Sequence, residues 1–190
     1  MRKRVTNLVV AAFLMAGVGV GYQMSHPANE ENPTTSIVVM QAEYPEYDTA
    51  RDLVGASDLV FHGVVRNIDY RMLDVSTSEG AEEDTGFSDA EAIPYTLYTV
   101  EVDKIYKGTI ENDTITIKRP GGRLGEEEYI VEDATEISAG RDYLFVTEAY
   151  EDTYPSLLNV TQSAYDMDAP QTMSEGGKSE ITLSEILALF

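Results

Sequence analysis

The segment LVFHGVV, from Leu59 to Val65, is an apolar run interrupted by one histidine and one glycine. Aliphatic, β-branched and aromatic residues at this density are typical of a β-strand, and the pattern extends to Tyr70. A glycine inside a strand marks a bulge, a coil or a place where another backbone comes close. The segment therefore predicts a long strand over residues 59–70 with a bulge or coil at Gly63.

Further strands are predicted on both sides of a turn at Lys107-Gly108. Residues 93–106 alternate, with Tyr98, Val100 and Val102 on one face, which indicates a half-buried strand. Shorter apolar or alternating runs predict strands at 114–118, 129–131, 143–146 and 157–165. Five or six strands with irregular turns favour a barrel over a helical fold.

Two helices are expected at the ends of this strand-rich region. Residues 47–56 form the first candidate, with Asp48 or Thr49 as N-cap, Leu53 and Val54 turned inward, and Gly55 at its end.

Residues 182–190 form the second helix candidate, where Thr182 and Glu185 make a capping box. One face of it carries four apolar residues: Leu183, Ile186, Leu187 and Phe190. The predicted fold class is mainly β: a small OB-like closed or partly open β-barrel with a short helix before the first strand and a C-terminal helix.

Three segments, at residues 56–65, 98–108 and 139–146, occur in the order SDLVF-G-V, V-V-KIYKG and G-YLF. This order resembles the netrin and metalloproteinase-inhibitor-like (TIMP-like) branch of OB-fold barrels over about residues 50–150. With Arg119-Pro120-Gly121-Gly122 it looks more like uncharacterised exported bacterial proteins of that shape. The resemblance implies the fold alone. Those inhibitors chelate zinc through an N-terminal cysteine, and this chain has no cysteine.

The N-terminus has the layout of an export signal. Three basic residues, Arg2, Lys3 and Arg4, precede an apolar run from Val5 to Tyr22. Residues 1–24 are therefore expected to be either a signal peptide, with cleavage after Gly21, or an uncleaved membrane anchor. Both alternatives place the remainder of the chain outside the cell or at its surface.

The rest of the chain divides into a linker and one domain. Residues 25–46 are polar and contain three prolines, which predicts a linker with a single apolar island at residues 37–40. Residues 47–190 are expected to form the OB-like barrel, with an acidic loop at 76–92. That loop is interpreted as a solvated insertion, with a calcium site as the alternative, although it lacks an EF-hand pattern.

The charge of the chain limits its partners. It has 34 acidic and 13 basic residues, a net charge of −21, and without the three N-terminal basic residues the net charge is −24. Such a charge repels polyphosphate and anionic lipid, so no nucleic-acid partner is expected, and membrane contact only through an uncleaved N-terminus. The expected partner is an unknown protein or a component of the cell envelope.

No catalytic, cofactor-binding or metal-ligating residue is assigned from the sequence. The chain has two histidines, His26 in the linker and His62 in the first strand, which is too few for a zinc site built on histidines. His62 is interpreted as structural, with a catalytic base as the alternative. Gly121-Gly122 is interpreted as a turn or bulge at a barrel corner, because three acidic residues follow within six positions and make a phosphate cradle implausible.

These observations favour an exported or cell-surface, non-catalytic binding module that uses no cofactor. One alternative is a protease-inhibitor-like protein that works without the chelating cysteine. The other is a hydrolase that uses two carboxylates, which would require a pair about 5–9 Å apart in a groove.

Salt is expected to stabilise the protein, because screening weakens the repulsion among more than twenty uncompensated negative charges. The melting temperature should rise along a sodium chloride series from low to physiological ionic strength. A flat series would show that the charges lie too far apart to interact.

Overall fold

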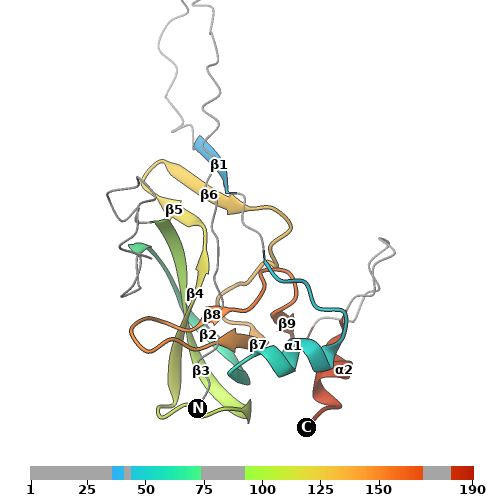
Figure 1. The fold of residues 1–190 in the computed structure, drawn as a ribbon. Coiled ribbons are helices and arrows are strands. Elements are labelled where there is room, and N and C mark those ends of the chain that lie inside the picture. The colour runs from blue at the N-terminus through green and yellow to red at the C-terminus, as the bar shows by residue number, and fades with distance from the viewer. Residues whose placement is uncertain (1–35, 41–43, 74–92, 169–180) are drawn as a thin grey trace, which may run out of the picture.

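The computed structural model describes residues 36–40, 44–73, 93–168 and 181–190. These residues form a mainly β structure with two short helices, and five of the strands close into a barrel (Figure 1). The fold class predicted from the sequence is confirmed. The predicted signal or anchor at 1–24 and the acidic loop at 76–92 lie outside the described residues. Neither described helix is long and apolar enough to cross a membrane.

The elements follow one another in this order: β1 (Ser36–Met40), α1 (Ala50–Ala56), β2 (Leu59–Leu73), β3 (Ile93–Lys107), β4 (Thr114–Pro120), β5 (Gly122–Leu124), β6 (Glu127–Val131), β7 (Asp142–Glu148), β8 (Ser156–Leu157), β9 (Ala164–Asp166) and α2 (Leu183–Leu187).

The barrel closes through β2, which pairs with a strand on each side. Along the barrel the strands run β2-β3-β4-β8-β7, and β7 returns to β2. β2 pairs antiparallel with β3 from Val60 to Leu73, and its first half also pairs antiparallel with β7, from Leu59 to Val64. β9 adds to the other side of β7. The second half of β2 runs beyond its pairing with β7.

A second, three-stranded sheet, β1-β6-β5, lies at the end of the molecule where β2 and β3 extend (Figure 1). β1 pairs in parallel with β6 from Ser36 to Met40. The predicted linker over 25–46 is therefore wrong for residues 36–40, which form a strand. Its apolar island was visible in the sequence, but its partner strand lies about ninety residues further along the chain.

Two hydrophobic cores share the strands β2 and β7. Phe61, Tyr98 and Phe145 belong to the cluster inside the barrel, and the Phe61 and Phe145 ring centroids are 5.5 Å apart. Val60 and Leu144 point to the opposite side, where they pack with Leu53 of α1 and Ile186 of α2. The first half of β2 is buried on both faces, which explains why its sequence is a nearly continuous apolar run.

Both helices lie where the sequence predicts, with differences at their ends. The Thr49 side chain caps α1 by accepting a hydrogen bond from the backbone N–H of Asp52, and α1 continues past Gly55 to Ala56. At α2 the predicted capping box of Thr182 and Glu185 is present. Phe190, which the sequence places on the apolar face of this helix, is 53% exposed, because α2 ends at Leu187. The ring of Phe190 packs instead on the ring of Tyr106, with 5.3 Å between the centroids.

The single strand predicted at 157–165 is instead two short strands, β8 and β9, separated by a turn. Asn159 makes the turn: its side-chain oxygen accepts hydrogen bonds from the backbone N–H groups of Thr161 and Gln162. Asparagine favours such side-chain turns over a strand. The apolar residues on either side of Asn159 are buried, which is why the segment resembles a strand in the sequence.

The backbone of β3 lies close against β2 at Gly63. A Cβ atom at this position would lie 2.1 Å from the carbonyl oxygen of Glu101, which no real contact allows. The pairing of β2 with β3 shifts register between His62 and Gly63, so a bulge occurs at the same place. The bulge or coil predicted at Gly63 is therefore present as a bulge, at the point where the β3 backbone lies close to Gly63.

Replacing Gly63 with valine should destabilise the protein strongly, because the obstructing atom belongs to the backbone of β3 and cannot rotate away. Overpacking costs about 1–3 kcal/mol in typical cores, and we expect at least the upper end of that range in a denaturant titration. Gly55→Ala is the matched control, because an added Cβ there meets no atom within 4 Å. Equal midpoints for Gly63→Val and the wild type would contradict the steric argument.

Candidate functional site

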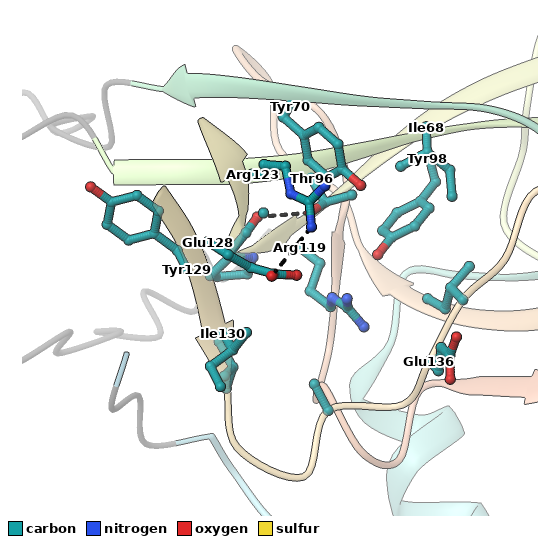
Figure 2. Close-up of a pocket in the computed structure, with 16 residues that line it drawn as sticks. Ile68, Tyr70, Thr96, Tyr98, Arg119, Arg123, Glu128, Tyr129, Ile130 and Glu136 are labelled. Carbon is teal, nitrogen blue, oxygen red and sulfur yellow. Dashed lines mark hydrogen bonds and ion pairs between the residues drawn. The ribbon is translucent and has the colours of Figure 1, made fainter. Parts of the chain in front are cut away.

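A pocket of about 350 Å³ opens between the extended end of β2 and β3, the corner from β4 to β5, and β6 (Figure 2). Its size falls in the range of small-molecule sites. Ile68 and Tyr70 come from β2, and Thr96 and Tyr98 come from β3. The pocket therefore lies where the barrel meets the three-stranded sheet.

The corner that shapes the pocket is Gly121-Gly122, as the sequence predicted. Both glycines have positive φ, 95° and 138°. A Cβ on Gly122 would lie 2.6 Å from the ring of Tyr70 and 2.8 Å from Oγ1 of Thr96. Thr96 also donates a hydrogen bond of 2.7 Å to the carbonyl of Gly121. The glycine pair therefore allows β5 to turn tightly against β2 and β3.

Arg119 is the polar centre of the pocket and lies in the middle of the residues drawn in Figure 2. Its guanidinium packs over the ring of Tyr98, 5.5 Å from the centroid, and one terminal nitrogen donates to the carbonyl of Thr135. Its Nε is buried and donates to no acceptor among the described residues. Buried hydrogen-bond donors almost always have an acceptor, so the Nε of Arg119 is an exception among the buried groups that the structure describes.

The charged side chains of the pocket balance one another. Arg123 pairs with Glu128 at 3.4 Å, and Arg119 and Glu136 also line the wall. Two guanidinium groups and two carboxylates make a pocket without formal net charge, although the chain as a whole carries −21. The site therefore offers donors and acceptors together.

Tyr44, just before α1, is electrostatically coupled to the pocket arginine. Burial, followed by the proximity of Tyr95, raises the pKa of the Tyr44 phenol to about 12, and the charge of Arg119 opposes that rise. The buried Tyr44 hydroxyl has no hydrogen-bond partner in the described part of the chain. The end of the predicted linker therefore packs beside the pocket.

Sequence reasoning found the corner of this site but none of its polar residues. In the sequence, Arg119 stands out only as a neighbour of Gly121-Gly122. No local pattern shows that β3 brings Tyr98 and β6 brings Glu128 to the same pocket. His62 lies on the first half of β2 and does not line the pocket. His26 lies outside the described residues.

No protein-family model matches the chain, and no curated protein matches it. The resemblance to netrin-like and TIMP-like barrels therefore stays a prediction, and the function has to be argued from the pocket.

Replacing Tyr44 with phenylalanine should reduce the loss of stability at high pH. The folded pKa of about 12 lies above the ordinary value of 10, so between these values the unfolded chain has released a proton that the folded chain retains. The wild type should thus lose about 1 kcal/mol through this group by pH 11. Tyr44→Phe should keep that stability.

The measurement is the denaturant midpoint at pH 7 and pH 11. At pH 7 the variant should equal or exceed the wild type, because it removes a buried hydroxyl without a partner. Tyr154→Phe, which removes a more exposed phenol, is the control. An identical alkaline loss in Tyr44→Phe and the wild type would exclude this role of Tyr44.

Proposed function

We propose that the protein is an exported, non-catalytic binding module whose pocket holds a saccharide unit. The observation that carries the proposal is the guanidinium of Arg119, which lines the pocket over the ring of Tyr98 and whose Nε donates to no acceptor among the described residues. The basic and apolar N-terminus supports export.

The charge balance of the pocket favours an uncharged, polyhydroxylated ligand. A sugar hydroxyl is both donor and acceptor, so one ligand can accept from Arg119 and donate to Glu136. An anionic ligand would meet the two carboxylates of the pocket and the field of a chain with net charge −21. A neutral sugar is repelled by neither the pocket carboxylates nor the negative charge of the chain.

The aromatic side chains favour a ligand with an apolar face. Tyr70 is 43% exposed at the pocket, while Tyr98 is buried beneath Arg119. An exposed aromatic ring with a polar edge suits a ligand that has both C–H and hydroxyl faces. OB-like barrels also bind oligosaccharides as well as oligonucleotides, and the charge of this chain disfavours the latter.

Hydrolysis of a saccharide is the second candidate, because Glu128 and Glu136 line the same pocket. Glycoside hydrolysis uses two carboxyl groups, one of them as a proton donor. The Glu128 carboxylate already forms an ion pair with Arg123 at 3.4 Å, so it is held by another side chain of the pocket. Binding without turnover is therefore the proposed activity.

The test is ligand-observed NMR and calorimetry with the full chain in mild detergent and a panel of neutral mono- and disaccharides. Matched sugar acids such as glucuronate against glucose form the second arm. We expect at least one neutral sugar to bind more tightly than its acid.

Arg119→Met should weaken that binding at least tenfold, because it keeps the apolar contact with Tyr98 and removes every donor. Arg51→Met, on the exposed face of α1, is the matched control. Preference for the acids, or equal loss in both variants, would contradict the proposal. Release of reducing ends that stops in Glu136→Gln would establish the hydrolase instead.

A further inference from the structure

A histidine and two aspartates from three neighbouring strands meet on the outer side of the barrel, away from the pocket residues. His62 lies on β2, Asp103 on β3 and Asp142 at the start of β7. One ligand atom from each of the three lies within 4.8 Å of the other two. His62 Nδ1 is 3.2 and 3.3 Å from the two carboxylate oxygens of Asp142.

The register of the strands explains why these side chains meet. His62 is paired with Lys104 and Gly63 with Val102, so Asp103 is the extra residue of a β-bulge. A bulge re-aims the side chain of its extra residue, here towards the face that carries His62. On the other side of β2, His62 is paired with Leu144 of β7. Asp142 precedes Leu144 by two residues, so its side chain projects from the same face of the sheet as His62.

We propose that His62, Asp103 and Asp142 bind one divalent transition-metal ion, with Zn²⁺ or Mn²⁺ as the ion that fits best. One imidazole nitrogen and two carboxylate oxygens are a mixed ligand set that first-row divalent ions accept. Calcium requires six to eight oxygen ligands, and this set offers too few. Three protein ligands leave coordination positions open to water or to a small ligand.

The spacing of the three residues fits a single ion after small side-chain rotations. Zinc ligands lie about 2.0–2.2 Å from the metal, so their donor atoms are roughly 3–4 Å apart. The His62–Asp142 pair already has this separation. The Asp103 carboxylate, which is exposed, only has to close the remaining gap by rotating about its side-chain bonds.

Aromatic neighbours hold the imidazole of His62 in place, and no salt bridge within the described chain occupies the Asp103 carboxylate. The ring of Tyr106 packs on His62, 5.9 Å between centroids, and the ring of Phe190 packs on Tyr106 in turn. Two basic side chains lie on the same strands: Lys104 lies over Tyr106 and Arg66 bonds Glu101 at 2.7 Å, although the Arg66 charge also attracts Asp103. Asp103 forms no salt bridge with another residue of the described chain.

Two histidines are too few for a zinc site built on histidines, so the sequence predicts no metal ligand at His62. The structure supplies carboxylates instead, from residues 41 and 80 positions away from His62. This site differs from an acidic cluster because its central ligand is a nitrogen, and that difference makes the proposal testable by spectroscopy.

The test is calorimetric titration of the metal-free full chain with Zn²⁺, Mn²⁺, Ca²⁺ and Mg²⁺ at constant ionic strength. We expect one equivalent of Zn²⁺ to bind at least tenfold more tightly than Ca²⁺. Co²⁺ should bind in its place and show visible absorption bands that are lost in His62→Gln.

Asp103→Asn and Asp142→Asn should each weaken Zn²⁺ binding at least tenfold, while Asp113→Asn, which removes an exposed carboxylate elsewhere, should change it less than twofold. Asp103 lies on an exposed bulge, so circular dichroism should show this variant folded even if His62→Gln is not. Equal effects of Asp103→Asn and Asp113→Asn, or equal affinity for Zn²⁺ and Ca²⁺, would overturn the site and indicate general attraction of cations by an acidic chain.

Discussion

The close approach of β3 to β2 at Gly63 is the constraint on which the rest of the structure depends. A side chain at this position would collide with the carbonyl of Glu101, so only glycine lets β2 keep both neighbours, β3 and β7, at once. Without that double pairing the barrel would not close. The bulge at the same place leaves Asp103 without a partner in the β2–β3 pairing. The close approach at Gly63 and the position of the Asp103 carboxylate beside His62 therefore have the same structural origin.

β2 carries both candidate sites because its two halves meet different surroundings. Its first half is enclosed between β3 and β7 and presents His62 between two aspartates. Its second half runs past the barrel and supplies Ile68 and Tyr70 to the pocket. Eight residues separate His62 from Tyr70, roughly 25 Å along an extended strand. The proposed metal and the proposed saccharide would therefore occupy separate places on one rigid element.

A chain without cysteine cannot use disulfides for stability, and its described residues form two hydrophobic cores. The inner cluster fills the barrel, and the outer cluster joins β2 and β7 to the two helices. Burial of strand residues on both faces increases the apolar area removed from water per residue. This offsets the repulsion that a net charge of −21 imposes on the folded state.

The sequence by itself determined the features that depend on neighbours along the chain. The alternation of residues 93–106, the apolar run at 59–65 and the capping box at Thr182 each report on a local conformation, and each is present. The glycines also predict a bulge or coil at 63 and a turn or bulge at 121–122 from the sequence alone. The positions of these glycines in the sequence do not show which other segment of the backbone lies against them.

Only the tertiary structure decided the features that depend on partners far apart in the chain. β1 is a strand because β6 pairs with it. The segment at 157–165 turns because the Asn159 side chain accepts hydrogen bonds from the backbone N–H groups of Thr161 and Gln162, while Leu157 and Leu158 fill the two cores. Arg119 acquires its tyrosines and glutamates, and His62 its aspartates, through the register of strands separated by long connections. Register depends on the packing of the whole sheet, so no local pattern could have assigned either site.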